Sequence, residues 1–154
     1  MANAPKAHNR HEVREKVLQA LYALEISKNP VPFVIETVLG ELQKNPDDYE
    51  FATKLFLETT QHQPAFDVLI KKKAANWEFH RIALIDKILL RMGICEMMYF
   101  DDIPPKVSIN EAIEIAKDFS TDKSGTFING ILDSILTDLR KEKTLSKKGR
   151  GLLE

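Results

Sequence analysis

Two arginines near the start of the chain have the residue type and spacing to contact phosphate groups. Arg10 and Arg14 are four residues apart, so in a helix they lie on one face. Guanidinium groups bind phosphate oxygens through paired N–H donors. Glu12 and Glu15 lie close to them in the sequence, and a mixed-charge helix face is most often solvated surface. The residues alone leave both interpretations open.

A second candidate site is the polar turn at residues 120–125, together with the aromatic residue that follows it. Lys123 and open backbone amides at a helix N-terminus can contact phosphate, and Phe127 can offer its ring face to a nucleobase. The alternative is a plain helix start, with Ser124 as the capping residue and Phe127 in the core. The local sequence favours neither interpretation.

The other polar residues give no positive evidence for catalysis or a metal. His8 and His11 are three residues apart, but no cysteine or further histidine completes a ligand set beside them. No phosphate-binding loop, dinucleotide fingerprint or nucleophile elbow is present. Glu96 falls within an apolar stripe, and a buried carboxylate needs partners, for which Arg81 and Arg91 are candidates. We therefore expect a protein that is not an enzyme and has no metal or cofactor.

Helices must position these side chains, because apolar residues recur at helical spacing along most of the chain. The stretch 85–100 is apolar on nearly every side and is predicted to be the buried central helix, with another helix close to Gly93. Ser108 and Glu111 have the spacing of a capping box, which predicts a helix that begins at Ser108. Helices are predicted at about 10–28, 33–43, 48–70 with a kink or end at Pro64, 85–100, 108–119 and 127–140.

Composition indicates an ordinary globular protein. The chain has 154 residues, 44% of them hydrophobic and 29% charged, with a net charge of −1, so any nucleic-acid surface must be a local patch. Cys95 is the only cysteine and cannot form an internal disulfide. The N-terminus has no apolar secretory segment, and the most apolar window, 88–100, is too short to cross a bilayer. We expect a cytoplasmic protein with no membrane contact.

Several motifs follow one another along nearly the whole chain. VLQALY at 17–22 is followed by Arg81-Ile82, Asp86, the run at 88–91 and Glu96. IPPKVSINEAIEIAKDF at 103–119 is followed by FINGILD at 127–133. In this order the motifs resemble the NusB family of bacterial transcription antitermination factors.

The resemblance implies an all-α fold of about seven helices in two small packed bundles, one formed by the first three helices and one from Trp77 onward. It implies a single domain, residues 1–154, in which 1–9 and about 141–154 are expected to be flexible. The implied function is non-catalytic. The protein would bind boxA RNA of nascent ribosomal transcripts with the ribosomal protein NusE, join the RNA polymerase elongation complex, and suppress premature termination.

The resemblance also implies RNA-binding residues. Arg10 and Arg14 match an arginine-rich element at the start of the first helix, although the family often has further basic residues where His11 and Glu12 stand. Lys123 and Phe127 match the loop, and the aromatic residue after it, at the RNA-facing surface. Some members carry an acidic residue in place of Lys123. Tyr22 is a weaker candidate on the same grounds.

Two other functions stay open. A NusB-like helical scaffold would act only through protein–protein contacts, and salt-dependent binding to boxA RNA would distinguish it from an RNA-binding factor. NusB-like domains also occur fused to ribosomal RNA methyltransferases, so an RNA-binding module related to theirs is the other alternative, although we expect no methyltransferase domain here. The resemblance leaves monomer and homodimer open as alternatives.

Overall fold

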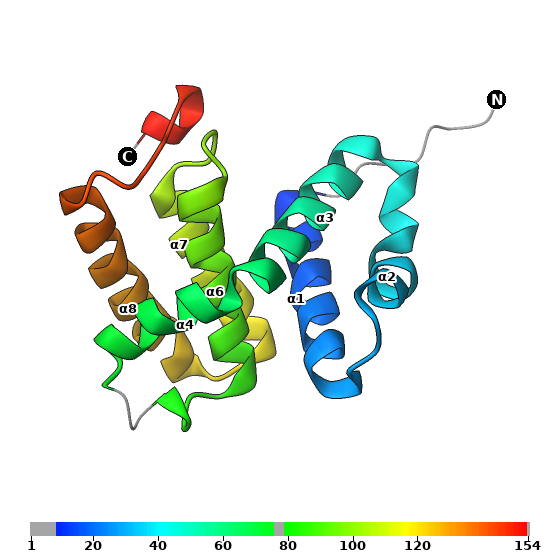
Figure 1. Cartoon of the computed structure of the whole chain (residues 1–154), viewed down its shortest axis with the longest axis horizontal. Helices are drawn as coiled ribbons and strands as arrows, with labels where there is room; N and C mark the ends of the chain where they lie inside the picture. Colours follow the sequence, from blue (N-terminus) through cyan, green and yellow to red (C-terminus); the bar gives the residue numbers. More distant parts are fainter. Residues whose placement is uncertain (1–8, 76–78, 154) are drawn as a thin grey trace. The chain divides into compact units, whose positions relative to one another are not determined.

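The computed structural model describes residues 9–75 and 79–153, and within them it contains seven α-helices and no strand. This confirms the all-α fold class. The chain divides into two compact units, with the boundary between Thr60 and Gln61 (Figure 1). Of the helices in the described ranges, none is both long enough and apolar enough to cross a membrane.

The first unit is built on α1, Arg10–Ser27. Asn9 caps this helix, because its side-chain oxygen accepts from the Glu12 amide at 2.8 Å. The predicted helix at 33–43 is instead a series of three short turns: α2 (Val31–Val34), the π-helix η1 (Ile35–Leu39) and the 3-10 helix η2 (Gly40–Lys44). Helix α3, Pro46–Gln61, completes the unit and contributes Phe51, Leu55 and Phe56 to its core.

The second unit contains α4 (Gln63–Lys73), α6 (Leu84–Tyr99), α7 (Pro105–Phe119) and α8 (Asp122–Lys141). Pro64 stands in the first turn of α4, where its missing N–H costs nothing, so α3 ends before it and a new helix begins. The chain at 63–73 therefore belongs to the second unit and does not extend the third helix of the first. Of the predicted bundle from Trp77 onward, Trp77 itself lies outside the described residues.

Helix α6 is the centre of the second unit, as its composition predicted. Every residue from 88 to 97 is buried, and α4, α7 and α8 all contact this helix. The expected close approach at Gly93 is also confirmed. A Cβ atom at this position would lie 2.8 Å from Leu132 Cδ1 of α8.

The capping box predicted at Ser108 and Glu111 is wrong. Helix α7 begins three residues earlier, at Pro105, so Ser108 lies inside the helix. Its hydroxyl donates to Glu96 Oε1 at 2.9 Å, and both side chains are buried. Arg91, one proposed partner of Glu96, instead donates from Nε and Nη2 to the carboxylate of Asp67, at 2.8 and 3.1 Å.

The chain after α8 folds back onto the C-terminal end of α6. Lys147 Nζ donates to the carbonyl oxygens of Glu96 and Phe100, at 3.0 and 2.6 Å, and so caps α6. The Lys148 amide donates to the Asp101 carbonyl, and the short 3-10 helix η3, Gly149–Leu152, follows. These contacts fall in the segment from about 141 onward, for which flexibility stays a prediction. Of the other expected flexible segment, only Asn9 lies within the described residues.

Candidate nucleic-acid interface

The start of α8 is organised by the hydroxyl group of Ser124. Thr121 is the N-cap residue, and its amide donates to Ser124 Oγ at 3.4 Å. Ser120 Oγ and Thr121 Oγ1 lie 2.9 and 3.0 Å from the same oxygen. Ser124 donates in turn to Asp86 Oδ2 at 2.8 Å. The N-cap residue is therefore Thr121, three residues before Ser124, whereas the plain helix start predicts Ser124 as the capping residue.

Asp86 brings a carboxylate from the first turn of α6 to this helix start. Its side chain is only 7% exposed. Oδ2 accepts from Ser124, whereas Oδ1 is buried and has no hydrogen-bond partner among the described residues. A buried acceptor without a partner costs about 1–3 kcal/mol. A group that donated to Oδ1 would recover that cost.

A cavity of about 420 Å³ opens beside this carboxylate, and we call it the α8 cavity. Its walls combine a carboxylate, hydroxyl groups, a guanidinium side chain, an aromatic ring and two aliphatic residues. The lining residues are Arg81, Ile82, Ala83, Asp86, Ser120, Thr121, Ser124 and Phe127. Apolar walls with a few convergent polar groups are typical of a ligand site.

Phe127 and Lys123, both predicted from the sequence, lie differently with respect to this cavity. Phe127 lines the cavity and is half-buried, so its ring is neither fully in the core nor fully exposed. Lys123 is exposed in the first turn of α8, outside the cavity lining. The structure thus places an aromatic surface in the cavity and a cation on the helix turn beside it.

Arg10 and Arg14 share a face of α1, as predicted, and both lie over the ring of Phe51 in α3. Their guanidinium carbons are 4.0 and 5.3 Å from the ring centroid. Arg10 is exposed, whereas Arg14 is only 3% exposed. Burial therefore separates their roles. Arg10 presents its charge to solvent, while Arg14 packs within the protein.

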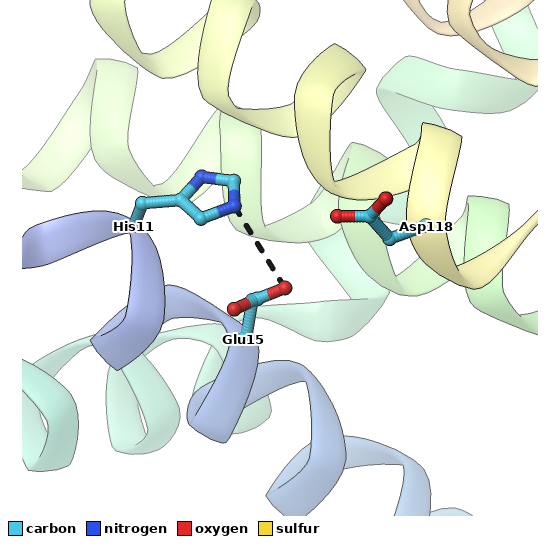
Figure 2. A group of neighbouring side chains, drawn as sticks. All are labelled: His11, Glu15 and Asp118. Carbon is cyan, nitrogen blue, oxygen red and sulfur yellow. Dashed lines mark ion pairs between the residues drawn. The ribbon is translucent and has the colours of Figure 1, made fainter.

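Two neighbours of these arginines interact with each other along α1. His11 Nε2 lies 3.7 Å from Glu15 Oε2, one helical turn away, and both side chains are half-buried (Figure 2). Asp118, also drawn in Figure 2, belongs to α7 of the second unit. The Glu15 carboxylate thus faces His11, and Arg10 is left as the exposed cation of this first turn. His8 lies outside the described residues.

Tyr22 is the last residue of the VLQALY motif and lies on α1. Its side chain is 41% exposed, so the ring is accessible on the first unit. The predicted residues consequently form two groups, Arg10 and Tyr22 on α1 and Lys123 and Phe127 at the start of α8.

The comparisons with known proteins all identify the same family. A model of the NusB family matches residues 11–137. This chain belongs to the NusB family. The transcription antitermination protein NusB of Salinibacter ruber is 45% identical over 146 residues, which cover 94% of this chain and 91% of that protein. The family is one of antitermination factors, not enzymes, in agreement with the sequence analysis.

Solved NusB structures share the fold. T. maritima NusB matches with a TM-score of 0.79 at 31% identity, covering 86% of this chain and 94% of that one. A crystal structure of the antitermination factors NusB and NusE in complex with dsRNA matches with a TM-score of 0.75 at 25% identity, covering 84% of this chain and 96% of that one. Members of the NusB family have thus been observed with NusE and with RNA.

Sequence reasoning did not assign a site role to Asp86. Asp86 belongs to the motifs that resemble the family, but nothing in its neighbourhood marks it as more than an acidic residue in the first turn of a helix. A weak signal was available, since a carboxylate opens a helix that is otherwise buried nearly all round. Its pairing with Ser124, 38 residues away, is a property of the fold.

Proposed function

We propose that this protein is an RNA-binding antitermination factor that recognises the single-stranded boxA element of nascent ribosomal transcripts together with NusE. The complex joins RNA polymerase in the cytoplasm and suppresses premature termination. Membership in the NusB family and the related NusB–NusE structure with RNA support this proposal.

The observation that carries the RNA interface is the unpaired Oδ1 of Asp86, a residue that lines the α8 cavity. Nucleobases present amino and imino N–H donors along their edges, and RNA-binding proteins read these edges on unstacked bases. An N–H group directed at Oδ1 would satisfy the orphan acceptor. Phe127 would stack against the same base, and the polar turn would surround it. Asp86 is thus assigned to base recognition and Phe127 to stacking.

The charged residues serve the RNA backbone. Arg10 and Lys123 are exposed cations at the starts of α1 and α8, where the positive end of the helix dipole adds to their charge. Phosphate contacts of this kind give affinity without sequence information. Tyr22 adds an accessible ring on α1. Arg14 supports this surface through Phe51, because its own side chain is buried.

Partnership with NusE is proposed from the related complex, and the charge of the chain supports it. The net charge is −1, so the RNA-binding cations form small local patches that bind weakly alone. A second RNA-binding protein adds phosphate contacts, and linking the two binding events raises the affinity of the complex. We expect boxA RNA to bind much more tightly to the mixture with NusE than to this protein alone.

Titration of labelled boxA RNA and of a scrambled RNA with this protein, with NusE and with the mixture tests the proposal. Tight, salt-dependent binding by the mixture with preference for boxA is the expected result. Equal affinity with and without NusE would contradict the cooperative part. The absence of salt-dependent RNA binding in every titration would instead favour a scaffold that acts through protein contacts alone.

A further inference from the structure

Two lysines from different helices share one aromatic ring in the second unit. Lys71 lies in the last turn of α4 and Lys87 in the first turn of α6. Their Nζ atoms are 4.8 and 4.6 Å from the centroid of the Phe79 ring. Phe79 is buried, and both lysines are half-buried. Both ammonium groups therefore contact the same ring, and we call these two residues the Phe79 lysine pair.

Neither ammonium of this pair has a carboxylate within ion-pair distance in the described part of the chain. Lys73, two residues after Lys71, shows the usual arrangement, with its Nζ 2.6 Å from Asp138 Oδ2. The pair is thus a local concentration of positive charge, and like charges at this range repel because they lie within the Debye length of about 10 Å.

The position of Lys87 adds to this excess. The first turn of a helix carries the positive end of the dipole and open N–H groups, so a cation there is disfavoured and an anion is favoured. Lys71 has the opposite setting at the C-terminal end of α4, where a cation is favoured. An anion bound at each ammonium would relieve both their repulsion and the unfavourable setting of Lys87.

We infer that each lysine of the Phe79 lysine pair binds a phosphate group of the RNA backbone beside the α8 cavity. Lys87 directly follows Asp86, and Arg81 lies two residues after Phe79; both Asp86 and Arg81 line the cavity. A nucleotide whose base enters the cavity would place its backbone at the edge of the cavity, beside these residues. A lysine ammonium binds phosphate as a compact point charge and needs no fixed orientation. The planar guanidinium of arginine, in contrast, binds carboxylate or phosphate through two parallel N–H donors.

This inference rests on the proposed RNA-binding function and is tested through salt dependence. Lys71→Ala combined with Lys87→Ala removes the pair. Lys71→Arg combined with Lys87→Arg keeps both charges. A matched control, Lys44→Ala with Lys106→Ala, removes two exposed lysines that lie outside the cavity lining. Circular dichroism and thermal unfolding verify that each variant is folded before binding is measured.

The measurement is the slope of the logarithm of the boxA binding constant against the logarithm of salt concentration, with NusE present. Each phosphate contact on a single strand contributes about 0.7 to the slope, so loss of two contacts should flatten it by about 1.4. Between about 50 and about 200 mM salt, the wild type should then lose about sevenfold more affinity than the alanine pair variant. The arginine variant should retain the wild-type slope, and so should the control.

Each other outcome overturns the assignment. An unchanged slope in the alanine pair variant, with wild-type RNA binding intact, shows that the pair contacts no phosphate. Equal flattening in the control shows a net-charge effect only. Loss of NusE binding with an unchanged RNA slope identifies an acidic protein surface as the ligand. Failure of the wild type to bind RNA in a salt-dependent way removes the proposed function itself, and this result is distinct from the other three.

Discussion

Asp86→Ala tests the central assignment, because the structure predicts a small effect on stability and a large effect on RNA binding. The substitution removes the hydrogen bond from Ser124 to Oδ2, a bond to a charged group worth about 1.5–3 kcal/mol. It also removes the buried Oδ1, whose missing partner costs about 1–3 kcal/mol. These terms oppose each other. The Ser124 hydroxyl keeps the neighbouring hydroxyls of Ser120 and Thr121 as partners. The expected net change in unfolding free energy is below about 1 kcal/mol.

RNA binding should respond much more strongly. If Oδ1 accepts from a base, its removal costs a charge-assisted hydrogen bond of about 1.5–3 kcal/mol, or about 10- to 150-fold in affinity. Asp86→Asn is the sharper variant. The amide oxygen introduced by Asp86→Asn can still accept from Ser124, but the amide NH₂ group then takes the place of Oδ1. A donor group of the base would face this NH₂ donor and find no acceptor. This variant should therefore bind boxA at least as weakly as Asp86→Ala.

The assay combines urea unfolding followed by circular dichroism with titration of labelled boxA RNA in the presence of NusE. Asp133→Ala is the control, since it removes one exposed negative charge from α8. A loss of unfolding free energy above about 3 kcal/mol in Asp86→Ala would identify the carboxylate as a structural group and refute the reasoning. Unchanged affinity in a folded Asp86→Asn variant would refute base recognition at this site.

Four further predictions follow from burial, stacking and charge. Leu89→Ala on α6 should cost about 2–5 kcal/mol in urea unfolding, because the side chain is fully buried; a cost below about 1 kcal/mol would mean that α6 is peripheral. Phe127→Ala should weaken boxA binding by a stacking contribution of about 1–3 kcal/mol without changing the salt slope. A drop in the unfolding midpoint of this variant with unaltered RNA binding would make Phe127 a core residue. Arg10→Ala should instead flatten the salt slope for boxA and scrambled RNA alike. The hydrogen bond and charge of Lys73 hold the pKa of Asp138 below its ordinary value of 3.8. Asp138→Asn should therefore lower the melting temperature slightly near neutral pH, and the difference in melting temperature from the wild type should vanish as the pH falls through the folded-state pKa. A difference that persists in acid would exclude this ion pair as its cause.

The sequence by itself determined the class of fold and its central element. Helical spacing of apolar residues predicted the helices, and the nearly continuous apolar surface of 85–100 predicted a buried post around which the others pack. The missing side chain at Gly93 predicted the close contact that Leu132 makes. The order of motifs along the chain indicated the NusB family before any coordinates. The helices and the buried post are visible in the sequence because helical spacing depends on residues within a few turns of each other.

Only the tertiary structure decided which polar groups meet. Ser108 has the local spacing of a capping residue, yet α7 begins three residues earlier, and the Ser108 hydroxyl donates to the buried carboxylate of Glu96 from another helix. Arg10 and Arg14 are equivalent in the sequence and differ in burial. Asp86 and Ser124, 38 residues apart, become partners because α6 and α8 pack side by side. Contacts between helices depend on where each helix begins and which face it turns inward, and short-range patterns carry little of that information.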